Sequence, residues 1–491
     1  MKTTNILGAI MLMAFCGCGA EKITLGLNTG GGEDYESERA IVEKFIAGPE
    51  MGALGIKTAE KDKKPGILID FFSAWKGNLP PGAIIMDKTY VVPVDEAPSK
   101  RRSAALADCL NGTERLVPLP ELAAPFTALR VDDLSVDADN YPLVQFRGIT
   151  IHAAGEAMEE KIKLLTAALG DYLAALYPPE ETPEITWIAS GGDVMLDRGA
   201  AEILFQEGPA GIFGKTAGML AGADIALINL EGVVSSRGQK ITKSFNFRFA
   251  PGVAATLKWS GIDAVLHANN HVYDYGADAF LDSLMWLKQA ELGIVGAGRN
   301  DDEASDPFVM PHGGETYRVF GIASFPRERN GWDGVTAAAE PDKPGMLHSG
   351  KGGAEKLKAK LAAAPGSPVT DILLFHGGVE WSRSPDKITR DLYTELIRSG
   401  ADLIIGSHPH VVQGFEWVLD KPVFWSLGNY VFGGMGNTDG GEEGLFIRLG
   451  FWRGKMVYLE PFALSLSHTR TDIAPEKNLA DFYTLSDELK P

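Results

Sequence analysis

Five apolar runs of strand length in this chain each lead into residue types that bind metal ions. The runs cover residues 185–189, 223–228, 262–266, 372–375 and 403–405. The polar residues that follow them are Asp193, Glu231, Asn270-His271, His376 and His408-Pro409-His410. In open α/β sheets, ligands bind in the crevice beyond the carboxyl ends of the strands. We therefore expect residues as far apart in sequence as Asp193 and His410 to share one site.

Helix-like segments alternate with these runs, as at residues 277–290 and 388–398, which is the βαβ rhythm of an α/β domain. Further strand-like runs cover residues 317–324, 422–425, 445–449 and 456–459. The pattern therefore predicts an α/β domain from residue 184 onward, with a second sheet.

At 491 residues the chain is long enough for about two to three domains. A stretch rich in Pro and Glu, residues 178–184, predicts a linker. Residues 21–177 before it predict a smaller α/β domain, within which residues 127–143 faintly resemble part of a periplasmic solute-binding domain; its role stays open. After the larger domain, residues 466–491 are predicted to be a C-terminal tail.

The N-terminus has the composition of an export signal. Lys2 precedes an apolar stretch, residues 6–15, that is too short to span a bilayer but suits a signal-peptide core. Cys18 follows this core and Gly17, which resembles a bacterial lipoprotein signal. Residues 1–18 are thus predicted to be a lipoprotein-type signal peptide with Cys18 lipidated; simple secretion is the alternative. We expect an exported protein, anchored by lipid to the membrane on the cell surface or periplasmic side.

The charge distribution bears on the class of partner. The formal net charge is −19, and no block of five or more like charges occurs. Nucleic-acid binding needs clustered Lys and Arg to neutralise phosphates, so no nucleic-acid partner is expected. Cys109 is left without an obvious cysteine partner and is expected to be buried as a small hydrophobic residue.

The donor types at the strand ends predict a particular kind of metal centre. Carboxylate, amide and imidazole donors suit Mn, Fe, Co or Zn rather than the thiolate sites of structural zinc. Two ions about 3.5–4 Å apart would need a bridging carboxylate and could activate a water, so one or two ions are expected. The proline in His408-Pro409-His410 predicts an extended backbone, in which both rings approach one centre. The predicted ligands are Asp193, Glu231, Asn270, His376, His408 and His410.

Other polar residues near these positions have predicted supporting roles. His271 is the predicted general acid or base. Asp274 and Glu380 are predicted to orient His271 and His376, respectively. Arg198 either pairs with a phosphate or carboxylate or lies on a solvated helix face. Asn429 is placed near the site, although ordinary turn chemistry also explains it.

Taken in order, the motifs resemble one family. They are Gly192-Asp193, Asn229-Leu230-Glu231, Asn269-Asn270-His271, His376-Gly377-Gly378, Gly406-Ser407-His408-Pro409-His410 and Ser426-Leu427-Gly428-Asn429. Over about residues 185–465, the chain resembles the CapA family of capsule and poly-γ-glutamate synthesis proteins, whose domain is similar to calcineurin-like metallophosphoesterases. The resemblance implies a four-layer α/β/β/α sandwich with the metal site at the strand ends.

The resemblance also implies roles for individual residues. Asp193 matches the aspartate of the first metallophosphoesterase motif, and Glu231 takes the place of the bridging aspartate. Asn270 matches the metal-binding asparagine, with His271 beside it as the catalytic histidine. His376 matches the histidine of the fourth motif, and the last motif supplies His408 and His410.

Two positions depart from the metallophosphoesterase pattern. Met195 stands where a ligand histidine is usual, so one metal is expected to be short of a ligand. Gly377 replaces the usual tryptophan of the fourth motif, which predicts the loss of an aromatic wall.

These features predict a metal-dependent hydrolase or transferase acting on a phosphate ester or a γ-glutamyl amide of an envelope polymer. The expected partners are the anionic polymer or its precursor and a membrane-bound polymer synthase. One alternative is a non-catalytic, metal-containing factor for polymer binding or export. Another is a sensor whose N-terminal domain recognises a solute.

Overall fold

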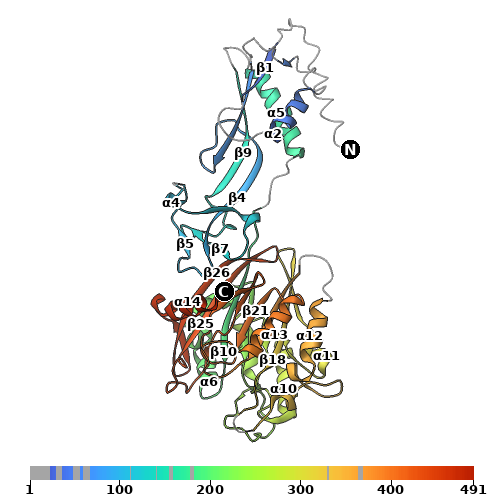
Figure 1. The fold of residues 1–491 in the computed structure, drawn as a ribbon, viewed down its shortest axis with the longest axis vertical. Helices are drawn as coiled ribbons and strands as arrows, with labels where there is room; N and C mark the ends of the chain where they lie inside the picture. The colour runs from blue at the N-terminus through green and yellow to red at the C-terminus, as the bar shows by residue number, and fades with distance from the viewer. Residues whose placement is uncertain are drawn as a thin grey trace. The chain divides into compact units, whose positions relative to one another are not determined.

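The computed structural model describes residues 23–28, 36–47, 56–58, 67–110, 112–139, 141–153, 159–176, 182–328, 331–362 and 369–490 (Figure 1). The chain forms two compact units. The first contains residues 1–93, 103–121 and 130–183, and the second contains residues 94–102, 122–129 and 184–491. The predicted signal peptide with Cys18, and residues 178–181 of the predicted linker, lie outside the described residues.

The first unit is built on a mixed sheet. Its strand order is β2 (Ile56–Thr58), β1 (Ile23–Asn28), β3 (Ile67–Trp75), β9 (Val144–Ala153), β4 (Ile84–Glu96) and β6 (Leu116–Pro118). The helices α2 (Glu36–Ile46) and α5 (Glu159–Leu176) share a hydrophobic cluster with this sheet. Leu165, Leu169 and Leu173 are buried on α5 because residues four apart lie on one helix face. This region is therefore a small α/β unit.

The second unit contains two larger sheets. In the first, the order is β15 (Gly293–Val295), β14 (Ala264–Leu266), β11 (Ile225–Leu230), β10 (Thr186–Val194), β25 (Glu443–Trp452), β26 (Lys455–Ser467) and β27 (Arg470–Ile473). A further strand, β24 (Asn429–Val431), also pairs with β10. The pairings from β15 to β10 are parallel, so the carboxyl ends of these strands lie at one edge of the sheet.

The second sheet of this unit also contains a run of parallel strands. Its order is β17 (Phe308–His312), β18 (Glu315–Ser324), β20 (Val369–Gly377), β21 (Leu403–Ser407), β23 (Lys421–Phe424) and β22 (Phe415–Val418). The pairings of β18, β20, β21 and β23 are parallel. The carboxyl ends of β20 and β21 therefore also lie together.

Alternating side chains divide the apolar residues between two faces of each sheet. Leu227 and Leu374 belong to a cluster that the two sheets share, whereas Ile228 and Phe375 point to the opposite faces. Helices pack on those opposite faces. They are α6 (Ala200–Glu207), α7 (Pro209–Phe213), α8 (Thr216–Ala221), α9 (Gly252–Trp259) and α10 (Gly276–Gln289) on the first sheet, and α11 (Asp301–Ser305), α12 (Gly353–Ala362) and α13 (Lys387–Arg398) on the second. The unit is thus mixed α/β with its main core between the sheets.

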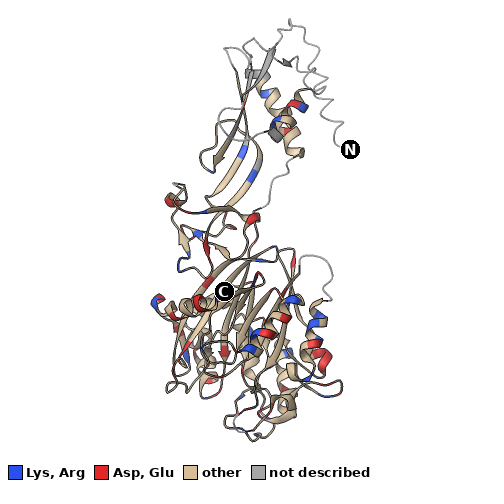
Figure 2. Cartoon of the chain, viewed as in Figure 1, with Lys and Arg blue, Asp and Glu red and all other residues tan. Residues whose placement is uncertain are grey.

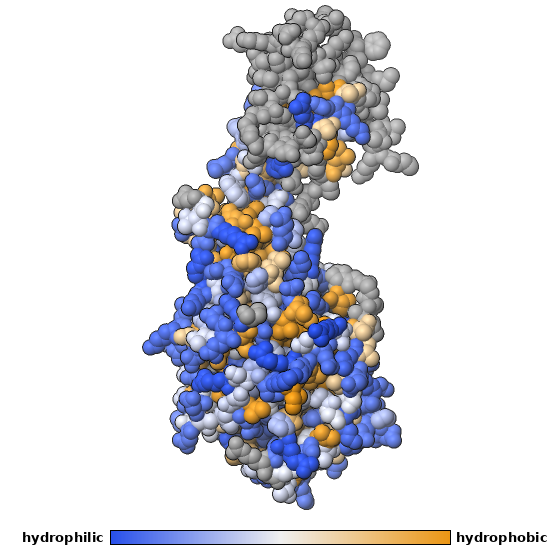
Figure 3. Space-filling view, in the orientation of Figure 1, coloured by the Kyte–Doolittle hydropathy of each residue, from blue (hydrophilic) through white to orange (hydrophobic). Residues whose placement is uncertain are grey.

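Shorter elements complete the described chain. They are β5 (Ser103–Ala104), α4 (Leu106–Leu110), β7 (Phe126–Ala128), β8 (Arg130–Val131), β12 (Val233–Val234), β13 (Arg248–Phe249), β16 (Ala297–Gly298), β19 (Gly345–Met346) and α14 (Ala480–Leu489). None of the helices within the described ranges is both long enough and apolar enough to cross a bilayer. Charges of both signs are interspersed on α12 and α13 (Figure 2), and the face of the second unit seen in Figure 3 is mainly hydrophilic.

The boundary predicted for the N-terminal domain differs from the structure. Residues 94–102 and 122–129 belong to the second unit, where β7 pairs with the end of β4. The guanidinium of Arg102 donates to the carbonyl oxygen of Pro461 at 2.6 Å, and the hydroxyl of Tyr483 donates to that of Ser99 at 3.0 Å. Residues 21–177 therefore do not form one continuous domain, because two of their segments complete the core of the second unit.

The predicted C-terminal tail, residues 466–491, is also folded. It contains β27 and α14, and the backbone N–H of Phe415 donates to Ser486 Oγ at 2.9 Å. Phe482 and Tyr483 of α14 join the cluster between the sheets. The second unit therefore continues past residue 465 to residue 490, near the end of the chain.

Candidate metal centre

The strand ends of both sheets bring the predicted ligands together. Asp193 is the next-to-last residue of β10, and Glu231 directly follows β11. His376 is the next-to-last residue of β20, and His408 directly follows β21. Parallel strands place these ends on the same side, so residues spread over more than 200 positions meet in one buried region.

A bulge places Asp193 at this edge. Ser190 pairs with Leu227 and Asp193 with Asn229, so β10 has one residue more than β11 over this stretch. The extra residue lies in Gly191-Gly192, where the backbone approaches its neighbours closely. A Cβ on Gly192 would lie 1.9 Å from the carbonyl oxygen of Gly428. Bulges commonly redirect a side chain beside a functional site, and this one directs the Asp193 carboxylate into the crevice.

Asp193, Glu231 and His410 form the tightest group. One donor atom from each lies within 4.8 Å of the other two, and all three side chains are buried. His410 Nδ1 is 3.2 Å from Asp193 Oδ2, and His410 Nε2 is 3.6 Å from Glu231 Oε1. Two carboxylates and an imidazole at this spacing make a donor set that fits one divalent cation.

His376, His408 and Asn270 adjoin this group. His376 Nδ1 lies 3.9 Å from Asp193 Oδ1, and His376 Nε2 lies 3.0 Å from Asn270 Oδ1. The ring centroids of His376 and His408 are 4.6 Å apart. All six predicted ligands therefore lie in one region, and Asp193 lies near both His410 and His376.

The backbone of the His-Pro-His segment differs from the prediction. His408 and His410 have φ values of 97° and 59°, so the segment is not extended. A proline restricts its own φ and disfavours only the α-helical region for the residue before it. The two rings still lie with their centroids 6.1 Å apart. Non-glycine residues at positive φ cost about 1–3 kcal/mol each, and such strain concentrates at functional sites.

The electrostatics of the centre are those of a site built for a cation. Neither carboxylate oxygen of Glu231 accepts a hydrogen bond from the described residues, and this side chain is 0% exposed. Burial raises the pKa of Glu231 well above its usual value. Burying a carboxylate without hydrogen bonds is costly unless a cation compensates it. This orphaned carboxylate shows that the residues present fit a divalent metal ion.

The histidines respond to burial and to these carboxylates in different ways. Burial lowers the pKa values of His376 and His408 well below the usual value, which favours the neutral form that binds metals. Burial would also lower the pKa of His410, but the charge of Glu231 and the hydrogen bond to Asp193 outweigh it and raise this pKa to about 10. His408 Nδ1 is buried and has no hydrogen-bond partner among the described residues.

His271 forms a pair with Asp274 beside the centre. His271 Nδ1 is 2.6 Å from Asp274 Oδ2, while His271 Nε2 is 3.7 Å from Glu231 Oε1. The backbone N–H of Phe247 also donates to Asp274 Oδ2 at 2.7 Å, and the Phe247 ring packs on the imidazole with centroids 4.2 Å apart. Burial lowers the pKa of His271. The arrangement allows Nε2 to give or take a proton in the crevice.

Of three predicted supporting residues, one is buried at the centre and two are exposed. Asn429 is buried, and its Oδ1 lies 2.9 Å from His410 Nδ1. Arg198 is exposed; its guanidinium donates to the carbonyl oxygen of Gly433 and lies 5.1 Å from the Phe247 ring. Glu380 is also exposed. The predicted role of Glu380 is corrected, because the ring nitrogens of His376 face Asn229, Ser407 and Asn270 instead.

Sequence reasoning missed two polar residues of this region. Asn229 Nδ2 donates to Asp193 Oδ1 at 2.7 Å and lies 3.1 Å from His376 Nδ1. Its position in the Asn229-Leu230-Glu231 motif was a signal that it shares the strand end with Glu231. Lys243 is buried between Asp274 and Glu328, and no strand precedes it directly, so no comparable signal marked it.

The departures from the metallophosphoesterase pattern have different structural outcomes. Met195 is buried among apolar residues on the helix-covered face of the first sheet, so it adds no donor to the centre. The predicted loss of the aromatic wall at Gly377 stays a prediction, but other aromatic rings lie beside the histidines. The Trp381 ring lies 5.4 Å from that of His410, and the Phe325 ring lies 5.6 Å from that of His408. Gly377 itself packs closely, because a Cβ there would lie 1.9 Å from the carbonyl oxygen of Ser324.

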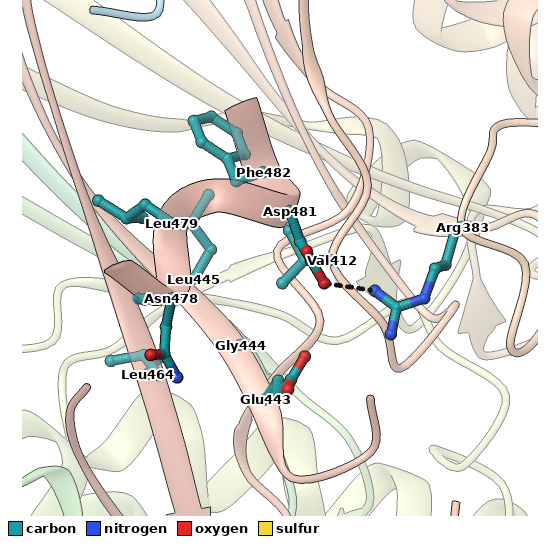
Figure 4. Close-up of a pocket in the computed structure, with 11 residues that line it drawn as sticks. Arg383, Val412, Glu443, Gly444, Leu445, Leu464, Asn478, Leu479, Asp481 and Phe482 are labelled. Atoms are coloured by element: carbon teal, nitrogen blue, oxygen red, sulfur yellow. Dashed lines mark ion pairs between the residues drawn. The ribbon is translucent and has the colours of Figure 1, made fainter. Parts of the chain in front are cut away.

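A separate small pocket lies beside β25, β26 and the start of α14 (Figure 4). Val412, Leu445 and Phe482 are among its lining residues. Arg383 Nη1 and Asp481 Oδ2, 3.6 Å apart, form an ion pair at its side. The lining contains none of the predicted metal ligands.

The fold and the site define a two-sheet α/β protein with a buried carboxylate and histidine centre at its strand ends. The chain belongs to the family described as bacterial capsule synthesis protein PGA_cap, whose model matches residues 187–434. This match confirms the resemblance to the CapA family.

Relatives with this family's names show how far the similarity extends. The capsule biosynthesis protein CapA of Bacillus anthracis is 28% identical over 249 residues, covering 49% of this chain and 58% of that protein. The PGA biosynthesis protein CapA of Bacillus subtilis is 27% identical over 244 residues, covering 49% of this chain and 62% of that protein. The alignments therefore span less than two thirds of these relatives. A solved phosphatase from Mycoplasma pneumoniae is similar over 62% of this chain and 99% of its own, with 13% identity and a TM-score of 0.37.

Proposed function

We propose that this protein is a metal-dependent hydrolase or transferase that acts on a cell-envelope polymer, at a phosphate ester or a γ-glutamyl amide. The observation that carries the proposal is the Glu231 carboxylate, which is fully buried, accepts no hydrogen bond from the described residues, and faces both His410 and His271. Family membership supports the polymer as the target. Within this proposal the layered arrangement is α/β/β/α, with the centre at the strand ends of both sheets.

The donor set assigns residues to the metal. Asp193, Glu231 and His410 would hold one ion, and His376, His408 and Asn270 would extend the site toward a second. Mn, Fe, Co and Zn suit these donors. A bound ion of this kind supplies a Lewis acid and an activated water near neutral pH.

His271 and Asp274 would then carry out the proton transfer. Asp274 accepts from His271 Nδ1, which leaves Nε2 directed toward Glu231 and the crevice. In this orientation His271 can donate a proton to a leaving group or accept one from an attacking group. The walls of Phe325, Trp381 and Phe247 keep the centre largely out of water.

The predicted lipoprotein signal and the family membership support a location at the cell envelope. The protein would be exported and lipidated at Cys18, and it would work beside a membrane-bound polymer synthase on the anionic polymer or its precursor. Cys18→Ser should then release the protein from the membrane fraction. Unchanged fractionation of that variant would contradict lipid attachment at Cys18.

The activity is tested with purified full chain and added Mn²⁺ or Zn²⁺. We expect stoichiometric metal binding and hydrolysis of either bis(p-nitrophenyl) phosphate or a γ-glutamyl peptide. Glu231→Gln should lose metal, whereas His271→Gln should keep metal and lose about 10²–10⁴-fold in turnover. His312→Gln, remote from the centre beside Asp224, is the matched control. Absence of metal binding by the wild-type chain would contradict the proposal.

A non-catalytic role in polymer binding or export is the second candidate. The buried position of Met195 favours it, because one metal position then has one donor fewer. Polymer production in cells carrying His271→Ala or His408→Ala separates the two. Normal polymer with His271→Ala but not with His408→Ala would show that the metal is needed without the proton-transfer residue.

A further inference from the structure

Lys243 is a buried cation close to the candidate metal centre. It lies in the segment between β12 and β13, and its side chain is 1% exposed. The ammonium is 3.1 Å from Asp274 Oδ1 and 2.8 Å from Glu328 Oε1. It also donates to the carbonyl oxygen of Asn270 at 2.6 Å and lies 4.5 Å from the Trp332 ring centroid.

One hydrogen bond and two ion pairs hold the ammonium in place. It donates to the carbonyl oxygen of Asn270, and it pairs ionically with the carboxylates of Asp274 and Glu328. These partners come from two separate parts of the chain: Asn270 and Asp274 lie in the loop between β14 and α10, and Glu328 lies after β18. The ammonium, whose side chain is 1% exposed, lies against groups of the protein itself. It acts on the protein groups that it contacts.

Asp274 connects Lys243 to His271 at the candidate metal centre. Its Oδ1 faces Lys243, while its Oδ2 faces His271 Nδ1 at 2.6 Å and the backbone N–H of Phe247 at 2.7 Å. The carboxylate is 0% exposed, so it depends on these three partners. Without Lys243, Asp274 Oδ1 loses its ion pair, and only the contacts of Oδ2 with His271 and Phe247 orient the carboxylate.

We propose that Lys243 is a positioning residue that holds Asp274 in place, and through it fixes His271 in the tautomer with its proton on Nδ1. Nε2 of His271 is then kept available on the side of Glu231. The carbonyl of Asn270 and the carboxylate of Glu328 hold the ammonium itself. The purpose of this arrangement rests on the proposed function, but its geometry is tested without any substrate.

The direct test is the tautomer of His271. The full chain is labelled with ¹⁵N-histidine, with and without Zn²⁺, and the His271 signals are identified by their loss in His271→Gln. The wild type should show one tautomer, protonated at Nδ1. Lys243→Met should give a mixture of tautomers or the opposite one, whereas Lys240→Met, at an exposed position of the same segment, should leave the spectrum unchanged.

Two results would overturn the inference. One is a wild-type His271 whose proton is on Nε2, a measurement that needs no variant at Lys243. The other is an unchanged His271 spectrum in Lys243→Met. If that variant does not fold, Lys243→Gln, which keeps a donor of similar length without the charge, takes its place.

Kinetics provide an independent readout with bis(p-nitrophenyl) phosphate and Mn²⁺. Lys243→Met should lower kcat by about 10–100-fold, the range found for residues that orient groups at metal sites, with little change in KM. In a His271→Gln background the same change should cost much less, because the two residues act as one unit. Fully additive losses would show that Lys243 does not act through His271. If the wild type cleaves no ester, the proposed phosphoesterase activity fails, while the tautomer measurement still decides the role of Lys243.

Discussion

Glu231 has a side chain whose cost to the fold depends on what occupies the crevice. Without a cation, its carboxylate is buried beside Asp193 with no hydrogen bond. Glu231→Gln should change the stability of the metal-free protein little, because burial already raises the pKa of Glu231 and favours its neutral form, which the amide resembles. The variant should gain nothing from Mn²⁺, whereas the wild type should gain about 2.7 kcal/mol at a hundred times its Kd.

Denaturant unfolding with and without Mn²⁺ measures both effects. Glu443→Gln, which removes an exposed carboxylate, is the control and should behave like the wild type. A Glu231→Gln protein that Mn²⁺ stabilises as strongly as the wild type would remove Glu231 from the predicted ligands.

His267 makes stability depend on pH. Its ring is fully buried, stacked on Phe280 with centroids 6.0 Å apart, and burial lowers its pKa to about 4. The unfolded chain takes up this proton near pH 6.5, so the stabilisation is complete above that pH. It is lost as pH falls toward 4, by an amount on the order of 3 kcal/mol.

His267→Leu should therefore flatten the fall in unfolding free energy between pH 7 and pH 4.5. His468→Asn, which removes an exposed histidine and tolerates the positive φ of that position, should retain the wild-type slope. Equal slopes in wild type and His267→Leu would show that this histidine does not titrate as its burial requires.

The sequence could predict the residues that follow a strand directly, because strand ends of parallel sheets converge whatever the details of packing. Asp193, Glu231 and His376 are of this kind. Lys243 could not be predicted, since its partners Asp274 and Glu328 are brought to it by loops from both sheets. The prediction of an extended backbone at His408 and His410 was wrong for a related reason. Tertiary contacts override the local conformational preference around Pro409.

β10 is the element on which the centre depends most. It pairs with β11, β24 and β25, and its two glycines let the backbones of β10 and β24 come close. Gly192→Ala would place a Cβ 1.9 Å from the carbonyl oxygen of Gly428. The backbone of β10 would have to shift to relieve this clash, and the shift would move Asp193, the next residue. We expect a loss of about 1–3 kcal/mol, as for overpacking in a core, together with weaker metal binding.

Gly218→Ala in α8 is the matched control, because nothing lies within 4 Å of its added Cβ. An alanine at an open helical position should stabilise by about 0.5–1 kcal/mol. Thermal unfolding and Mn²⁺ titration of the pair provide the comparison. If Gly192→Ala matched Gly218→Ala in both measurements, β10 and β24 could not be in such close contact.

Apolar runs and helical periodicity predicted the elements that carry their own signal, such as β11, β20 and α13. β24 was harder to predict, since its three residues are set by pairing with β10 and not by any long apolar run. The same applies to β7 and β27, whose partners lie in distant parts of the chain. The local sequence pattern does not show which distant strands will pair.

The second unit as a whole cannot be obtained by cutting the chain at the predicted linker. Ala97 and Ala128, buried in this unit, lie before residue 184, as does Ser99, which accepts from Tyr483. A truncated protein of residues 184–491 should therefore unfold at a lower temperature than the same unit in the full chain, because apolar surface covered by these segments becomes exposed.

The unfolding transition that Mn²⁺ shifts identifies this unit in both proteins. A full chain cleaved at a protease site placed within residues 178–181 is the control, since it retains residues 94–102 and 122–129. It should keep the higher transition temperature. Equal transitions for the truncated protein and the full chain would show that the two segments contribute nothing to stability.

The division of residues 94–129 between two units also bears on how such a gene can change. Recombination at a single point can exchange one unit for another only where the chain passes between them once. Here the chain passes between the units repeatedly, so any single crossover removes strands or core residues from one of them. Exchange of the first unit for another would therefore need several crossovers, placed at the boundaries of its three segments.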